Sequence, residues 1–401
     1  ATASYYTYDT MLAQLQEWAA AYPQVTQVTS IGKSIEGREI WALKVSDNPA
    51  VDELEPACLL VGGTHAREWI GVEVAMAALQ AYLEGYSTDE KLTRLVNERE
   101  VWFVPMLNPD GILFSQNSQR YWRKNRRPAG SSFGVDLNRN FGYKWGLTGA
   151  SDKPYSDTYH GAEPFSEPET RAVKELAERE RFQTSLAFHS YSELILYPFA
   201  YGYNAPNPDE AVYKDIGGQM AKFNKYKVQN CTELYPAMGI SDDWLYGDQK
   251  TIALTFELAQ EFIPPPQKIA AITAATVPAV LLMIEKTAAI AVNNPSGETA
   301  PTFSLDTTDG LEALAMGQRL MTQVSGFARE MLAARLQSTV RQVATVATDN
   351  ALSGNSTSLT QVRQSPAAPL VMPQIRSRLR FEACHGRSIP SAIMELVVPG
   401  R

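Results

Sequence analysis

Hydrophobic and polar positions follow two different periods along the first part of the 401-residue chain. In residues 8–21, apolar side chains such as Met11 and Leu15 fall on one helical face, which predicts an α-helix. Residues 24–30 and 39–46 instead resemble strands, and the glycine-containing stretch between them is typical of a turn. The chain is therefore expected to begin with a helix followed by a β-hairpin.

Apolar runs and helical patterns alternate over the residues that follow. This alternation is typical of a sheet with helices packed on its faces. We predict an α/β fold, with one large domain over residues 1–294 and a central mixed, twisted sheet. The expected strands are 58–62, 100–106, 184–188, 194–197 and 252–256, and the expected helices are 68–83, 167–179, 210–223 and 267–290.

The composition changes near residue 295. Residues 295–310 contain proline and glycine and are predicted to be a linker. The extension 311–401 has no lysine and no tryptophan. Its first part, 311–347, has the pattern of an amphipathic helix, whereas 353–373 is rich in Ser, Thr, Gln and Pro and is expected to lack fixed structure. The extension is interpreted as a segment removed on maturation, with an interaction helix or foreign sequence as alternatives.

Charge and hydropathy narrow the classes of partner. Hydrophobic residues make up 44% and charged residues 20% of the chain, as in a soluble globular protein. With a net charge of −8 and a single basic cluster at 120–127, which is interpreted as a solvated face, we expect no nucleic-acid partner. The longest charge-free apolar stretch, 269–284, contains Pro278 and is shorter than a membrane span, so we expect a core helix and no membrane partner. A monomer is the expected state.

Cysteine usage and the start of the chain bear on localisation. The cysteines Cys58, Cys231 and Cys384 are far apart and form no CxxC pair, so buried free thiols are expected. The chain opens at Ala1 without a methionine or a leader pattern. We therefore expect a mature, secreted protein that has lost a signal peptide and a propeptide.

Candidate metal ligands follow two of the predicted strands. His65 and Glu68 come after strand 58–62, and His189 follows strand 184–188. Two histidines and one glutamate leave a coordination position open for water, which is typical of catalytic rather than structural zinc. Glu257, at the end of strand 252–256, is the candidate base for that water, although a salt-bridged strand end is an alternative.

Several segments carry a resemblance to a known family. Their order along residues 1 to about 290 is similar to that of zinc metallocarboxypeptidases of the pancreatic A/B type, and especially of secreted bacterial members. The segments are Thr64-His65-Ala66-Arg67-Glu68-Trp69, Asn108-Pro109-Asp110-Gly111, Trp122-Arg123-Lys124-Asn125-Arg126, Asp136-Leu137-Asn138-Arg139-Asn140-Phe141, Phe188-His189-Ser190-Tyr191-Ser192 and Thr255-Phe256-Glu257-Leu258.

The resemblance implies roles for the catalytic residues. His65, Glu68 and His189 bind one zinc ion. Glu257 takes a proton from the zinc-bound water and delivers it to the leaving amine. Arg123 stabilises the negative charge that develops on the scissile carbonyl oxygen.

The resemblance also implies residues that hold the substrate, which is the C-terminus of a peptide or protein. Asn138 and Arg139 bind the free carboxylate, for which the planar arginine fork is suited. Tyr235 matches a mobile tyrosine that closes over the substrate. Arg67 lies in the adjoining subsite, and Tyr191 is a further substrate-binding residue.

Side-chain preference depends on the segment around Asp242. In the resembling family, an aspartate at this position marks a preference for C-terminal lysine or arginine. A buried carboxylate pairs with a cation and is left unpaired by an apolar group. Alternatively, Asp242 or Asp243 caps a helix, and Ala237, Ile240 and Thr255 line a pocket that also accepts apolar residues.

Four acidic residues are candidate ligands for a second metal ion. Asp52, Glu53, Glu55 and Glu100 are similar to acidic residues that bind stabilising calcium in bacterial relatives, and oxygen ligands suit calcium. Because Ala57 interrupts the acidic pattern, a solvated acidic loop is an equal alternative.

Two other functions are alternatives to a carboxypeptidase. A related zinc amidohydrolase acting on cell-wall peptides or acyl amino acids is disfavoured by Arg139 and Tyr235, which fit an ordinary C-terminal carboxylate. A catalytically inactive binding module is disfavoured because Glu257 and the three zinc ligands are all present.

Overall fold

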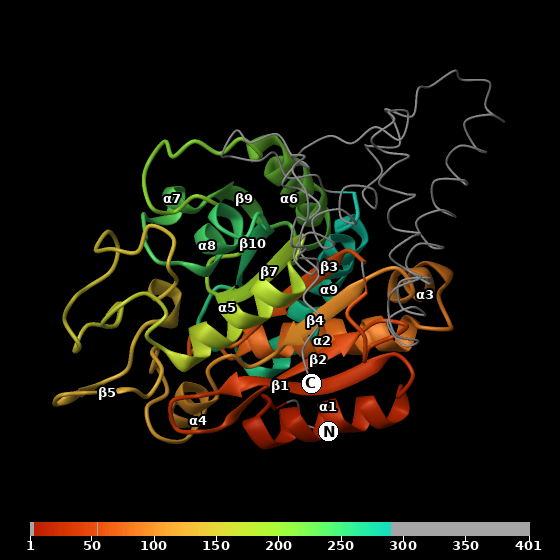
Figure 1. The fold of residues 1–401 in the computed structure, drawn as a ribbon, viewed down its shortest axis with the longest axis horizontal. Helices are drawn as coiled ribbons and strands as arrows, with labels where there is room; N and C mark the ends of the chain where they lie inside the picture. The colour runs from red at the N-terminus through yellow and green to blue at the C-terminus, as the bar shows by residue number, and fades with distance from the viewer. Residues whose placement is uncertain (1–3, 54, 290–401) are drawn as a thin grey trace, which may run out of the picture. The chain divides into compact units, whose positions relative to one another are not determined.

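The computed structural model describes residues 4–53 and 55–289 (Figure 1). The expected linker at 295–310, the extension at 311–401 and Cys384 lie outside the described residues. The two described cysteines, Cys58 and Cys231, are buried free thiols, as the sequence predicts.

An eight-stranded mixed sheet forms the centre of the described residues. In sheet order its strands are β1 (Thr26–Lys33), β2 (Glu39–Val45), β4 (Glu100–Val104), β3 (Ala57–Val61), β7 (Thr184–Ser190), β10 (Ile252–Leu258), β8 (Leu194–Tyr197) and β9 (Lys227–Asn230). The predicted hairpin of β1 and β2 is confirmed, with Thr26 opposite Val45 in an antiparallel pair. The neighbours β4, β3, β7 and β10 run parallel, so their carboxyl ends meet at one edge.

Helices cover both faces of this sheet (Figure 1). They are α1 (Tyr8–Ala21), α2 (Ile70–Gly85), α3 (Glu90–Val96), α4 (Pro109–Asn117), α5 (Pro168–Glu180), α6 (Glu210–Asn224), α7 (Cys231–Leu234), α8 (Ser241–Gly247) and α9 (Ile269–Lys286). On β3, Cys58 and Leu60 pack with α2, α6 and α9, whereas Leu59 and Val61 pack with α5 and α8. Burial on both faces explains why β3 is an unbroken apolar run and why every residue of β7 is buried.

Helices α1, α5 and α6 begin and end within one residue of their predicted bounds. Helix α9 ends at Lys286 rather than at residue 290, and α2 starts at Ile70 rather than at residue 68. The turn before it directs Glu68 toward His65 and His189. Gly71 then lets the helix approach β7 closely, because a Cβ there would lie 2.5 Å from the carbonyl oxygen of Phe188.

The sequence patterns missed the short elements. These are α3, α4, α7, β9, the 3₁₀ turns η1 (Leu137–Arg139) and η2 (Pro266–Lys268), and a hairpin of β5 (Pro128–Ala129) and β6 (Ser132–Phe133).

Helix α9 is the most apolar helix that the structure describes. The span Pro266–Lys286 is long and apolar enough to cross a membrane by length and composition alone. In the fold, Ala279, Val280 and Met283 are buried with side chains of α2 and α6. The sequence-based prediction of a core-facing helix is therefore confirmed for this face.

Candidate active site

The candidate catalytic residues lie where β3, β7 and β10 end. After β3, the chain turns at Gly63, which has a φ of +64°. A Cβ on Gly63 would lie 2.8 Å from Cδ1 of Ile112, so conformation and space both favour glycine. The turn brings His65 to the sheet edge that β7 and β10 reach with His189 and Glu257, which are paired in register.

The three predicted metal ligands come together in one buried group. Nδ1 of His65 is 2.8 Å from Oε1 of Glu68, and Nδ1 of His189 is 2.9 Å from Oε2. The two Nδ1 atoms are 3.0 Å apart. Two imidazole nitrogens and a carboxylate are a donor set that suits zinc, so these residues fit that ion. Burial opposes ionisation of Glu68, but the two imidazoles outweigh it and lower its pKa.

Asp136 organises this group, and the sequence analysis missed its role. Its Oδ1 is 3.1 Å from Nε2 of His65, and its Oδ2 accepts from Nε of Arg123 at 3.0 Å. The backbone N–H of Asn138 also donates to Oδ1, at 3.0 Å. A carboxylate at Nε2 keeps the proton there and leaves Nδ1 of His65 free to bind a metal. Burial would raise the pKa of Asp136, but Arg123 and His65 hold it well below its usual range.

Arg123 is oriented toward the metal ligands by this carboxylate. Its Nη2 is 2.9 Å from Asp136 and its Nη1 is 3.7 Å from Glu68. The solvated-face interpretation of the basic cluster is therefore wrong for Arg123 and for Lys124, which are 8% and 3% exposed. Lys124 instead donates to the carbonyl oxygen of Pro154 at 2.7 Å.

Glu257 is the candidate base, and it lies on β10 directly beside His189 of β7. Burial raises its pKa to about 8, against the opposing effects of His189 and Arg123. A carboxylate whose proton affinity is raised in this way is suited to proton transfer near neutral pH.

The predicted carboxylate-binding residues lie together on the loop that follows β6. Arg139 donates through Nε to Gly149 O at 2.8 Å and through Nη1 to Asn138 O at 2.6 Å. Oδ1 of Asn138 accepts from the backbone N–H of Ser241 at 2.9 Å. The ring centroid of Tyr235 lies 5.8 Å from the Arg139 guanidinium, and Tyr235 is 47% exposed. A fixed arginine therefore lies beside an exposed tyrosine.

Arg67 and Tyr191 meet on a residue that the sequence analysis did not single out, Phe262. The guanidinium of Arg67 lies 4.1 Å from the Phe262 ring centroid, and Tyr191 packs edge-to-face on the same ring at 4.9 Å. Arg67 also contacts Asp157 and the carbonyl oxygen of Tyr121, each at 3.4 Å. The only sequence signal for Phe262 is its place just after β10.

Proteins similar in sequence to this chain are zinc carboxypeptidases, which agrees with the candidate metal ligands described above. The profile of the family described as zinc carboxypeptidase matches residues 11–279. The chain belongs to the zinc carboxypeptidase family. A zinc carboxypeptidase of Saccharothrix mutabilis subsp. capreolus is 36% identical over 267 residues, which cover 63% of this chain and 62% of that protein. Zinc carboxypeptidase A 1 of Anopheles gambiae is 34% identical over 304 residues, covering 71% and 68%. The chain thus spans less than two thirds of the Saccharothrix relative.

Solved structures of the family share the fold. Carboxypeptidase A from Helicoverpa armigera superposes with a TM-score of 0.65 at 29% identity, covering 72% of this chain and 74% of that one. Bovine thrombin-activatable fibrinolysis inhibitor, in complex with tick carboxypeptidase inhibitor, gives a TM-score of 0.64 at 27% identity, covering 71% and 97%. The predicted α/β zinc carboxypeptidase fold is confirmed.

Asp242 lies close to His189, one of the three candidate metal ligands. It is 2% exposed, and its Oδ2 accepts from Oγ1 of Thr255 at 2.7 Å. Burial raises its pKa, which the Thr255 hydroxyl and His189 partly offset. No cation pairs with it among the described residues. Ala237 and Ile240 are buried in a neighbouring apolar cluster that also contains Leu196.

The alternative that Asp242 or Asp243 caps a helix is wrong. Helix α8 begins at Ser241, its N-cap is Ile240, and no side chain caps it. Asp243 instead accepts from the backbone N–H groups of Ala200 and Tyr201, at 2.9 and 3.0 Å. Asp243 therefore holds the loop after β8.

The four acidic residues considered for calcium do not form one group. Glu53 and Glu55 lie with Asp47, whereas Asp52 and Glu100 lie with Glu180. Nζ of Lys44 is 2.7 Å from Oε1 of Glu100, and both side chains are buried. This ammonium already supplies a positive charge to the second group, and the first group is partly exposed, as acidic groups without a bound ion commonly are. Neither group therefore supports calcium binding.

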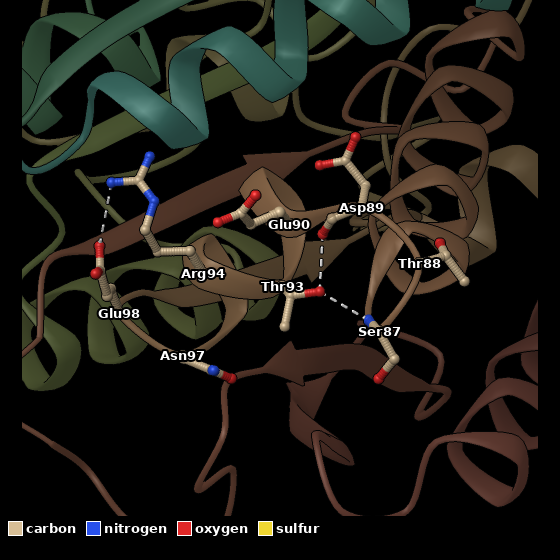
Figure 2. Close-up of a pocket in the computed structure, with 8 residues that line it drawn as sticks. All are labelled: Ser87, Thr88, Asp89, Glu90, Thr93, Arg94, Asn97 and Glu98. Carbon is tan, nitrogen blue, oxygen red and sulfur yellow. Dashed lines mark hydrogen bonds and ion pairs between the residues drawn. The ribbon is translucent and has the colours of Figure 1, made fainter.

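Figure 2 shows a hollow around α3, and none of the residues that line it is a candidate catalytic residue. Asp89 accepts from the backbone N–H of Leu92 and caps α3, and Thr93 bonds Ser87. These polar contacts are local to the helix, and none involves a residue of the metal group.

Proposed function

We propose that this chain is a zinc metallocarboxypeptidase that hydrolyses the C-terminal peptide bond of peptides and proteins. The observation that carries the proposal is the buried group of His65, Glu68 and His189 beside Glu257 and Arg123, at the edge where three strands end. Family membership supports the same reaction class.

Arg139 and Asn138 give the reaction its restriction to chain ends. A buried guanidinium held by two backbone carbonyls keeps N–H groups available for a substrate carboxylate. Asn138 is fixed by the backbone of Ser241, so its amide group has a defined direction. Tyr235 is exposed next to this pair and is suited to cover a bound C-terminus.

Arg123 and Glu257 carry out the remaining steps. Asp136 holds Arg123 so that its charge faces the carbonyl oxygen on which negative charge develops, and it does so before the substrate arrives. When bound, zinc polarises a carbonyl and lowers the pKa of water. Glu257 accepts the proton of the attacking water and donates it to the departing amine, which the raised pKa of its carboxyl group favours.

Asp242 is proposed to select substrates that end in arginine or lysine. Its charged form is buried without a cationic partner among the described residues, so a basic side chain would relieve the cost of desolvation. The apolar side chains of Ala237 and Ile240 lie in the same region and support additional acceptance of apolar ends.

Replacing the base separates catalysis from metal binding. Glu257→Gln should retain one zinc ion per chain and lose about 10²- to 10⁴-fold in kcat, because it removes a general base and no ligand. Glu261→Gln is the matched control, since Glu261 lies on the exposed loop after β10. Metal analysis and hydrolysis of a blocked dipeptide check both values. Retained turnover in Glu257→Gln would refute the assignment.

We also propose that the protein acts outside the cell as a monomer, on the basis of its resemblance to secreted bacterial members of the family. Activity in the culture medium and the mass of the eluted species in gel filtration test these two points.

A further inference from the structure

The segment before α1 contacts the loop that carries Phe262. The Tyr5 hydroxyl donates to the carbonyl oxygen of Pro264 at 2.6 Å, across 259 residues of sequence. Residues 264–266 are three consecutive prolines, so this stretch has no backbone N–H with which to pair. Its carbonyl groups need donors from elsewhere, and Tyr5 supplies one of them.

Tyr5 is itself fixed relative to the metal group. Its ring packs edge-to-face on Trp69 at 5.4 Å, and Trp69 directly follows the ligand Glu68. The next residue, Tyr6, donates its backbone N–H to Glu73 of α2 at 2.6 Å and accepts from Gln116 of α4 at 2.8 Å. The segment is therefore attached to two helices.

The loop has a second attachment on the metal side. The hydroxyl of Ser190, which follows the ligand His189, donates to the carbonyl oxygen of Phe262 at 3.0 Å. Two hydrogen bonds, from Ser190 and Tyr5, thus hold carbonyl groups two residues apart in sequence. Between them they set the position of the Phe262 ring, on which Arg67 and Tyr191 pack.

We propose that Tyr5 is a positioning residue for substrate binding: its hydrogen bond to Pro264 fixes the Phe262 surface, which contacts substrate residues upstream of the scissile bond. The inference rests on the proposed carboxypeptidase function. Tyr5 touches neither Arg123, Glu257 nor the carboxylate-binding residues in any contact of the described residues, so its effect should be confined to longer substrates.

Substrate length provides the test. For zinc-loaded full-length protein, Tyr5→Phe should raise KM for a tetrapeptide about 2- to 10-fold, the worth of one neutral hydrogen bond. Its kcat, and its KM for an acetylated dipeptide, should not change. Tyr8→Phe is the matched control, because the Tyr8 hydroxyl also donates to a backbone carbonyl, that of Glu39 at 3.0 Å, but on β2.

The possible results are distinguishable. If Tyr5→Phe and Tyr8→Phe change the ratio of KM for the tetrapeptide to KM for the dipeptide by the same factor, the positioning role is overturned and the proposed function is left intact. Failure of the unsubstituted protein to cleave either substrate overturns both. If Tyr5→Phe is poorly folded, Tyr5→Trp replaces it and is assayed at low temperature. A double-mutant cycle then combines Tyr5→Trp with Phe262→Leu. The cycle supports the role if the two losses of tetrapeptide affinity are not additive, and additive losses overturn it.

Discussion

Glu73 offers a sharp test of how burial controls charge in this fold. It lies on α2, is 7% exposed, and accepts one hydrogen bond, from the Tyr6 backbone N–H at 2.6 Å. Burial raises its pKa from 4.5 to about 7, and the bond from Tyr6 only partly offsets this. The isosteric change Glu73→Gln keeps an acceptor for Tyr6 and removes the ionisable group.

The direction in which the free energy of unfolding changes with pH follows from how many protons the folded and unfolded states bind. Below pH 4.5 Glu73 is protonated in both states, so its ionisation contributes nothing. Between pH 4.5 and about 7 the unfolded chain ionises and the folded chain does not, so the free energy of unfolding falls as pH rises. A difference of 2.5 pKa units corresponds to about 3 kcal/mol. Above pH 7 this loss is complete and constant.

Urea unfolding at pH 5, 6, 7 and 8 measures the effect. Between pH 5 and pH 8, the free energy of unfolding of Glu73→Gln should rise by about 2.5 kcal/mol relative to that of the unsubstituted protein, because part of the total effect has already occurred at pH 5. Glu84→Gln is the matched control on the exposed side of α2 and should show no such gain. Identical pH dependence in Glu73→Gln and the unsubstituted protein would refute the reasoning, because it would mean that Glu73 ionises as easily in the fold as in water.

Two further substitutions probe the site. Asp136→Asn should weaken zinc binding about 10- to 100-fold, because His65 loses the carboxylate that fixes its tautomer; competition with a chelator measures this, and zinc affinity equal to that of the unsubstituted protein would exclude the role. Asp242→Asn should lower kcat/KM for C-terminal Arg and Lys about 10- to 100-fold, the worth of a charged hydrogen bond, with Leu and Phe substrates spared. Asp248→Asn, on the exposed end of α8, is the control, and an unchanged basic preference in Asp242→Asn would remove it from the pocket.

The parallel strands and long helices could be predicted because burial repeats along them. β3, β7 and β10 are mostly apolar, and His65, His189 and Glu257, at or just after their ends, already suggested metal chemistry. Helices α3, α7 and α8 are too short for a helical period to be recognised. The start of α8 also depends on a distant contact, because the backbone N–H of Ser241 donates to Oδ1 of Asn138.

The site could be predicted as a set of residue types more readily than as a set of contacts. His65, Glu68 and His189 were identified by their place after strands, whereas Asp136 was not, because nothing local shows that its carboxylate reaches His65 across 71 positions. Phe262 and Tyr5 carry no motif, and their relation depends on a bond between the two ends of the described chain. The calcium hypothesis lost its support for a similar reason, since Lys44 reaches Glu100 from another strand.

The most direct test of the account compares one peptide with a free and an amidated C-terminus. The zinc-loaded protein should release single C-terminal residues from the free peptide, with C-terminal Arg or Lys removed fastest, as seen by mass spectrometry. The amidated peptide should stay intact, because Arg139 then has no carboxylate to bind. Cleavage of the amidated peptide at a similar rate, or cleavage at internal bonds, would contradict the claim that these residues form a carboxypeptidase.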